Sequence, residues 1–287
     1  MVAGPAAPSR LTARERARRA AQGRVSRSAP APLVAPALIA VAFLVLPLAG
    51  LVVRAPWSRL GPVLSGADAT QALVLSLWTA TVTTGISLVI GVPLAWLLAR
   101  VSFPGRRILR ALVTLPLVFP PVVGGVALLL AFGRTGFLGR YLNSWFGLTI
   151  PFTPIAVVMA ETFVAMPFLI ITVEGALRSA DQGFEEAAAT LGAGRMTVFR
   201  RVTVPMIAPS LGAGAVLCWA RALGEFGATI TFAGSFPGQT ETMPIAVYYA
   251  LETDPDAAIA LSLVLLAVSV IVLVSLRDRW LRGGSAP

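Results

Sequence analysis

Charged side chains within long apolar stretches are the positions of this sequence where chemistry is most readily expected. They are Glu161, Arg221 and Glu225. An isolated charge costs at least about 2.5 kcal/mol in hydrocarbon. Because Arg221 and Glu225 are spaced i, i+4, a helix places them on one face. We therefore favour a structural ion pair, next to Gly224, over an element that lines a pathway. Glu161 is either a buried hydrogen-bonding group or a pathway residue, and the sequence does not separate the two.

Missing residue types exclude most catalytic chemistry. The chain has no histidine, which is the commonest general base and a frequent zinc ligand. Every basic residue is an arginine, so a phosphate-binding loop that requires lysine cannot form. No nucleophile with an adjacent base stands out, and Cys218 lies in an apolar run, as expected of a small buried hydrophobe. We expect no catalytic residue and no metal site, and any ATP must be hydrolysed by another chain.

The composition predicts a protein that resides in a bilayer. Of the 287 residues, 56% are hydrophobic and 13% are charged, which is too apolar for an ordinary water-soluble domain. A helix needs roughly 20 apolar residues to cross the hydrocarbon core. Stretches of that kind are 33–53, 72–99, 112–132, 155–173, 207–232 and 257–276. We expect an all-α, polytopic membrane protein with about six transmembrane helices.

Helix breakers interrupt the middle stretches. They are Pro93, Pro116, Pro120, Pro121, Gly124, Gly125, Pro167, Gly212, Gly214 and Gly224. Proline and glycine are tolerated in membrane helices where neighbouring helices satisfy the freed backbone groups. The middle spans are therefore expected to pack tightly and to bend.

Arginine placement predicts the topology. Cytoplasmic flanks carry more positive charge than external ones. One side would hold the arginines of 1–32, 100–110, 178–201 and 277–287, whereas the other holds Arg54, Arg59, Arg134 and Arg140. Both termini are therefore predicted to be cytoplasmic. A nucleic-acid-binding surface would gather the arginines on one face, and this alternation argues against it.

The chain divides into three regions. Residues 1–32 are rich in Arg, Ala, Ser and Pro, which predicts a disordered tail or a short helix on anionic lipid. The first apolar run is a full span without a convincing cleavage site, so a secretory signal is not expected. Residues 33–276 form the predicted transmembrane domain, and 277–287 form a cytoplasmic tail.

The predicted cytoplasmic segment 181–205 differs from the other loops. Phe184, Ala188 and Leu191 are spaced i, i+4, i+7, so a helix there would carry one apolar face. Gly192 and Gly194 would end or bend that helix, and a second short helix would span 195–204. Such a helix would either fit a groove on a cytosolic partner or rest on the lipid surface. The residues alone leave both possibilities open.

The spacing within this segment resembles the signature of permease subunits of prokaryotic ABC importers. It comprises Glu186-Ala187-Ala188, then Gly192, and then Val202-x-Val204-Pro205. Valine replaces isoleucine and leucine of the family pattern and keeps the apolar character. The resemblance implies the type I permease fold and a coupling helix that docks on an ATP-binding subunit. The coupling residues would be Phe184, Glu185, Glu186, Ala187, Ala188, Leu191 and Gly192.

Further segments resemble oxyanion permeases, and molybdate permeases most closely. These segments are 219–248, 115–125 and 133–139, and the similarity extends from about residue 33 to the end of the chain. The resemblance implies a homodimer with one pathway, two ATP-binding subunits that carry ATP and Mg²⁺, and an external oxyanion-binding protein. No cofactor is expected in this chain.

The implied role is molybdate import by alternating access across the cytoplasmic membrane of a prokaryote, with the chain as a multi-pass subunit. A sulfate, thiosulfate or tungstate permease of the same architecture is the nearest alternative. An ion-coupled secondary transporter is a more distant one, because it would be expected to show inverted repeats and membrane carboxylates without a docking loop.

Overall fold

The computed structural model describes residues 31–282, which form helices and no strand. It divides into two units, Met1–Val53 and Arg54–Pro287, which we describe separately. The described part of the first unit is α2, Ala31–Val53, an apolar helix of 23 residues that contains Pro36 and Pro47. It is long and apolar enough to cross a membrane. The first predicted span is thereby confirmed, whereas the predicted tail lies almost entirely outside the described residues.

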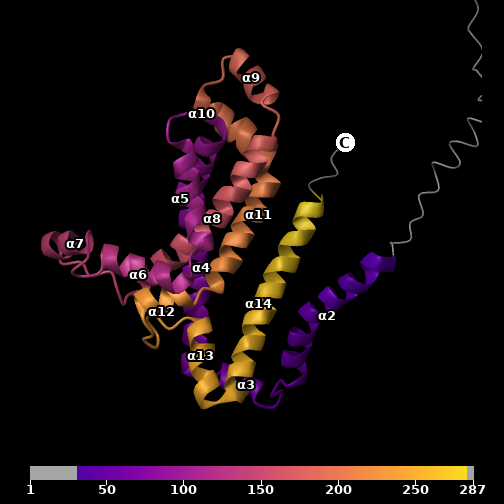
Figure 1. Cartoon of the computed structure of the whole chain (residues 1–287), viewed down its shortest axis with the longest axis vertical. Helices are drawn as coiled ribbons and strands as arrows, with labels where there is room; N and C mark the ends of the chain where they lie inside the picture. Colours follow the sequence, from indigo (N-terminus) through magenta and orange to yellow (C-terminus); the bar gives the residue numbers. More distant parts are fainter. Residues whose placement is uncertain (1–30, 283–287) are drawn as a thin grey trace, which may run out of the picture. The chain divides into compact units, whose positions relative to one another are not determined.

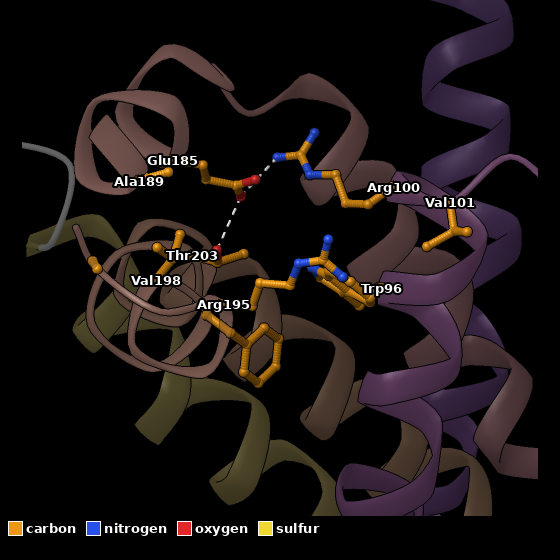
Figure 2. A pocket seen from close by; sticks show the side chains of 10 residues that line it. Trp96, Arg100, Val101, Glu185, Ala189, Arg195, Val198 and Thr203 are labelled. Atoms are coloured by element: carbon orange, nitrogen blue, oxygen red, sulfur yellow. Dashed lines mark hydrogen bonds and ion pairs between the residues drawn. The ribbon is translucent and has the colours of Figure 1, made fainter. Parts of the chain in front are cut away.

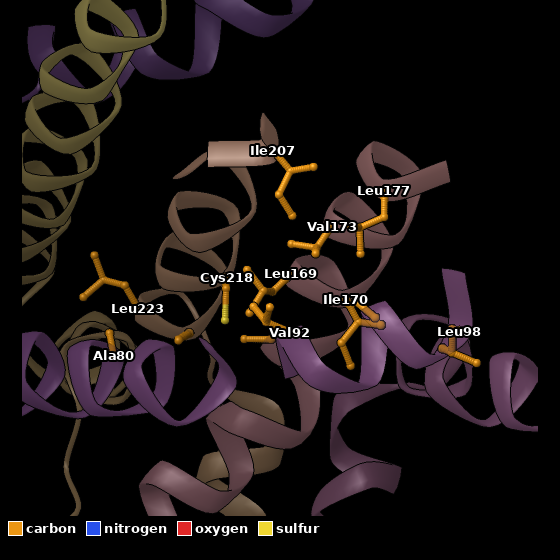
Figure 3. Close-up of a cluster of buried hydrophobic side chains, with 13 residues drawn as sticks. Ala80, Val92, Leu98, Leu169, Ile170, Val173, Leu177, Ile207, Cys218 and Leu223 are labelled. Carbon is orange, nitrogen blue, oxygen red and sulfur yellow. The ribbon is translucent and has the colours of Figure 1, made fainter. Parts of the chain in front are cut away.

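Three long helices form the centre of the second unit. They are α4 (Ala67–Arg100), α8 (Pro154–Ser179) and α11 (Val204–Leu223), which run alongside one another in Figure 1. Their buried side chains form one apolar cluster (Figure 3), which includes Val92, Leu169 and Cys218. Cys218 is fully buried there, which confirms its expected role as a small core residue.

Small residues let these helices approach closely. A Cβ at Gly91 of α4 would lie 3.3 Å from the Ile170 side chain, and one at Gly214 of α11 would lie 3.0 Å from Leu169. Close approach at small residues is a common basis of helix association in membranes, where there is little hydrophobic driving force between helices. The middle spans are packed tightly, as expected.

The third predicted span, 112–132, is not one continuous helix. It consists of α5 (Arg106–Val118) and α6 (Pro121–Phe132), which are bent by 118° relative to each other. Phe119 and Pro120 are extended between them, because a residue before proline is pushed out of the helical region. Residues 31–282 include five helices that could cross a membrane, or up to six if this bent pair is one span.

The fifth predicted span, 207–232, is also not one continuous helix. Helix α11 ends at Leu223, and the short helix α12 spans Gly227–Ala233. The stretch after it, predicted as a loop, contains α13 (Met243–Thr253). Met243 and Ala246 of α13 are buried against Ala72 and Leu261, so this helix belongs to the packed part of the chain.

Four short helices lie at the two ends of this bundle. Figure 1 places α9 (Gly183–Thr190) and α10 (Arg195–Val198) at the end where α4 finishes, and α3 (Leu60–Leu64) and α13 at the other. Helix α7 (Gly139–Phe146) follows α6. Helix α14 runs from Pro255 to Arg282, so most of the predicted C-terminal tail continues the last span as helix.

Candidate functional site

Helix α9 is defined by hydrogen bonds at both ends. Asp181 Oδ1 accepts from the Gly183 N–H at 2.9 Å just before the helix. At the other end Gly192 has a φ of +85°, and the N–H of Ala193 donates to the Ala188 carbonyl at 3.1 Å. A left-handed glycine with this hydrogen bond is a Schellman motif, which ends helices. The predicted helix and its end at Gly192 are confirmed.

Most of the predicted coupling residues lie on the open surface of α9. Phe184 is 63% exposed and Leu191 is 88% exposed. Glu186 and Ala187 are exposed as well, and Ala188 is half-buried between them. An apolar surface of this kind, next to acidic and small residues, can accept another protein surface.

Glu185 is the exception, because it points inward. Its Oε1 accepts from Arg100 Nη2 at 3.0 Å and from Thr203 Oγ1 at 2.9 Å, as Figure 2 shows. The Arg100 side chain is 7% exposed and that of Glu185 is 18% exposed. Glu185 therefore ties α9 to the end of α4 and to the turn that precedes α11. We call this set of Glu185, Arg100 and Thr203 the clasp.

The clasp was only partly predictable. The sequence marked Glu185 as a coupling residue but gave no reason to connect it with Arg100 or Thr203. Arg100 stands at the end of an apolar stretch, where it was interpreted as a topology signal. Thr203 occupies an unspecified position of the signature. Both partners come from other elements, so spacing within the segment carries no signal for them.

The link from the clasp to α11 is a wide helical turn. Helix α10 continues into the π-helix η1 (Phe199–Thr203), in which the Val204 N–H donates to the Phe199 carbonyl. Pro205 has no N–H with which to close an α-helical bond to the Arg201 carbonyl, which accounts for the irregular turn. The predicted helix over 195–204 is therefore present, but it is not a regular α-helix.

A second ion-pair group lies at the same end of the bundle. Glu174 of α8 is 8% exposed and contacts Arg110 of α5 at 2.5 Å and Arg178 at 3.5 Å. This group joins α5 to α8 just before the coupling segment. Two carboxylates thus connect helices at this end of the bundle: Glu174 joins α5 to α8, and Glu185 joins α4 to α9.

Arg221 and Glu225 do form an ion pair, with 2.5 Å between Arg221 Nη2 and Glu225 Oε2. Glu225 is not within the span, because α11 ends at Leu223. Its other oxygen accepts from the Ala228 N–H at 2.8 Å, so Glu225 connects the end of α11 to the start of α12. This geometry agrees with the favoured structural pair.

Gly125 and Gly227, unlike Gly224, lie where the packing of α6 against α12 leaves little room for a side chain. A Cβ at Gly224 would make only an ordinary contact, 3.6 Å from the Ala220 carbonyl. At Gly125 of α6 it would lie 2.6 Å from Thr231 Cβ, and at Gly227 of α12 it would lie 3.0 Å from Pro121. Gly125 was noted in the sequence only as a helix breaker, and its contact with α12 could not be foreseen.

Glu161 lies in the interior between α8 and α4. It is 2% exposed and accepts from Thr79 Oγ1 at 2.8 Å and from Thr83 Oγ1 at 3.0 Å. In this structure Glu161 is a buried hydrogen-bonding group. In the described part of the chain, no three acidic or cysteine side chains converge as a metal site would require.

Comparison with known proteins assigns the family. Residues 91–283 match the model of the binding-protein-dependent transport system inner membrane component. The chain belongs to this family. The permease is therefore a transport subunit rather than an enzyme.

Relatives of known function are similar over most of the permease. The molybdenum transport system permease protein ModB of Mycobacterium tuberculosis is 48% identical over 244 residues, which are 85% of this chain and 92% of the relative. The protein of the same name from Escherichia coli is 41% identical, over 74% and 92% of the two chains. The sulfate transport system permease protein CysT of Salmonella typhimurium is 36% identical over 84% of this chain and 88% of the relative.

Solved structures of ABC transporters have a similar fold. A bacterial ABC transporter involved in the import of the polysaccharide alginate aligns with a TM-score of 0.72 at 18% identity, over 88% of the permease and 94% of that chain. The MetNI methionine ABC transporter aligns with a TM-score of 0.59 at 21% identity, over 76% of the permease and 96% of that chain. The predicted type I importer permease fold is confirmed.

Proposed function

We propose that the permease is the membrane subunit of an ATP-driven molybdate importer that works by alternating access. The observation that carries this proposal is the 48% identity to a molybdenum transport permease over 85% of the chain. The sulfate permease relative is less similar, at 36% identity over a similar share of the chain. This difference in identity favours molybdate over sulfate as the transported anion. Tungstate, a dianion of the same shape, is the remaining alternative.

The proposed partners follow from the site and from the family. A separate ATP-binding subunit, which carries ATP and Mg²⁺, docks on the exposed face of α9. An external binding protein delivers the anion, and two copies of the permease enclose one pathway in the cytoplasmic membrane of a prokaryote. A related alginate transporter has been solved with its periplasmic protein bound, which supports the binding-protein partner.

The clasp explains how movement at α9 would reach the spans. Glu185 bonds to Arg100 at the end of α4 and to Thr203 at the start of α11. A displacement of α9 by the ATP-binding subunit would therefore pull on two of the three central helices. Packed helices shift between discrete arrangements rather than deform continuously, so a small displacement at α9 is sufficient to bias the pathway.

Transport in vesicles tests the proposal. The permease, reconstituted with its ATP-binding subunit and binding protein, should import molybdate only when ATP is enclosed with the ATP-binding subunit. An excess of sulfate should compete poorly. If sulfate uptake is faster than molybdate uptake, the cargo assignment is wrong. If vesicles that lack the ATP-binding subunit accumulate molybdate, the chain is an ion-coupled carrier instead.

A further inference from the structure

A cavity lies behind the coupling helix. It has a volume of about 330 Å³, is open on one side, and is lined by residues of α4, α9, α10 and η1. Its polar lining includes Arg100, Arg195, Glu185 and Thr203, and Trp96 and Phe199 form an apolar wall. Figure 2 shows Arg100 reaching from α4 toward Glu185, and Arg195 reaching from α10 toward Trp96. Two cationic side chains therefore share this space with one carboxylate.

Arg100 has more donors than the described protein satisfies. Its side chain is 7% exposed, and only Nη2 is paired, with Glu185. Its Nε and Nη1 are buried and have no hydrogen-bond partner among residues 31–282. Buried donors are almost always paired, and an arginine offers five N–H groups. Glu185 also accepts from Thr203, so it cannot serve all of them.

The charge balance of the cavity favours an anion. Arg100 and Arg195 together carry two positive charges, and Glu185 carries one negative charge. Arginine binds tetrahedral oxyanions such as phosphate through paired, charge-assisted hydrogen bonds. An oxyanion between the two guanidinium groups would supply the acceptors that Arg100 lacks and neutralise the remaining charge.

An apolar pocket adjoins the cavity. It has a volume of about 220 Å³ and is lined by Pro93, Met196, and the Trp96, Arg195 and Phe199 side chains that also line the cavity. Pro93 precedes Arg100 on α4, so this pocket lies further toward the interior of the membrane. A ligand with a charged head and an apolar tail would occupy both spaces.

We propose that the cavity binds one tetrahedral oxyanion group, with Arg100 and Arg195 as its cationic ligands. The adjoining apolar pocket favours the headgroup of an anionic phospholipid as the source. A free oxyanion, including the cargo after its release into the cytoplasm, has the same chemistry. In either case the occupant bridges α4 and α10 and stabilises the clasp. This inference does not depend on which anion the permease transports.

Two binding measurements on the complete transporter test the site and identify the source. Native mass spectrometry counts phosphatidylglycerol retained after exchange into detergent with excess phosphatidylcholine. Equilibrium dialysis of the delipidated complex measures binding of molybdate. The test variant is Arg195→Gln, because Arg195 lies outside the clasp. The matched control is Arg107→Gln, which removes the same charge from an exposed position on α5.

The site predicts that Arg195→Gln weakens binding about tenfold, as expected for loss of one charge-assisted contact, whereas Arg107→Gln binds as the wild type does. Loss of phosphatidylglycerol retention identifies a lipid headgroup, and loss of molybdate binding alone identifies a free oxyanion. Arg195→Lys should restore most of the affinity. If Arg195→Gln and Arg107→Gln behave alike in both measurements, the proposal is wrong.

Discussion

At the scale of residues, adjacent glutamates have opposite orientations. Glu186 belongs to the family signature and is exposed, whereas Glu185 is directed inward to Arg100 and Thr203. Neighbouring residues on a helix do not share a face, so the two carboxylates cannot contact the same surface. Glu186 is available to a partner, and Glu185 connects that surface to the spans.

The clasp should be visible as a stability difference. Glu185→Ala leaves Arg100 buried without its carboxylate, which should cost about 1–3 kcal/mol. Thermal denaturation of the purified permease measures this as a lower Tm. Glu186→Ala removes the same group from the exposed position and should leave the Tm unchanged. Equal losses from both substitutions would show that Glu185 is not a structural link.

The clasp also predicts rescue. The charge-swapped pair Glu185→Arg with Arg100→Glu should recover part of the ATP-driven uptake lost in each single variant, because the ion pair is restored in reverse. Uptake and ATP hydrolysis are measured together in vesicles. A double variant no better than the single variants would indicate that the pair does not transmit movement.

At the scale of elements, the broken helices place polar backbone and charged side chains at defined positions. The break before α6 follows from Phe119 and Pro120, and the break before α12 carries Glu225, which pairs with Arg221 and bonds to the Ala228 N–H. Non-helical backbone within a membrane is tolerated where protein groups satisfy it. These breaks are therefore expected to be fixed parts of the fold.

The contact between α6 and α12 depends on Gly125. A Cβ there would lie 2.6 Å from Thr231 Cβ and 2.8 Å from the Ala228 carbonyl. Gly125→Ala should therefore destabilise the permease by about 1–3 kcal/mol, as overpacking does. Gly85→Ala on α4 is the matched control, because nothing lies within 4 Å of that Cβ. Thermal denaturation compares them, and an unchanged Tm for Gly125→Ala would contradict the packing described.

The turn between α13 and α14 should be sensitive to acid. Arg59 holds the pKa of Asp254 below its ordinary value of 3.8, chiefly through a side-chain hydrogen bond. The group therefore adds stability above about pH 3.8 that is lost as the pH falls through its lowered pKa. The Tm difference between wild type and Asp254→Asn should shrink from pH 6 to pH 3.

A control separates the ion pair from helix capping. Asp254 accepts from the Ala257 N–H as well as from Arg59, and Arg59 also pairs with Asp256. In an Arg59→Gln background, the Tm difference made by Asp254→Asn should therefore change less with pH than it does in the wild type. If the two differences change alike, Arg59 does not stabilise the turn.

The sequence predicted the features that depend on a single segment of the chain. It did not predict those that depend on contacts between two segments. Period and length located the spans, and the Gly192 end of α9 followed from local turn chemistry. The sequence did not predict where α5 and α11 end. Whether a membrane helix continues through Pro120 or Gly224 depends on the helices packed around it, and these are not visible in the local sequence. Helix α13 was missed because its buried face, with Met243 and Ala246, is short and belongs to no full-length span.

At the scale of the whole molecule, ion pairs lie at both ends of the second unit. Arg100, Arg110 and Glu174 lie at the end that carries α9, whereas Arg59 pairs with Asp254 at the end that carries α3 and α13. Positive residues are retained on the cytoplasmic side. We therefore propose that the α9 end faces the cytoplasm.

Accessibility labelling tests this orientation. Thr190→Cys and Glu252→Cys place thiols at exposed positions at opposite ends, and Cys218 is fully buried and should react little. A membrane-impermeant maleimide added to intact cells should label position 252 and not position 190. Labelling of position 190 from outside would reverse the topology.

The most direct test of the central claim, that α9 is the docking surface for a separate ATP-binding subunit, is co-purification of that subunit with Ala188→Arg. Ala188 is half-buried among exposed residues of α9, so a bulky charge there would disrupt the apolar face and should abolish association and ATP-driven molybdate uptake while membrane insertion remains normal. Ser102→Arg, which adds the same side chain to the exposed α4–α5 loop, should retain both. If Ala188→Arg co-purifies fully with the ATP-binding subunit and transports at the wild-type rate, α9 is not the docking surface.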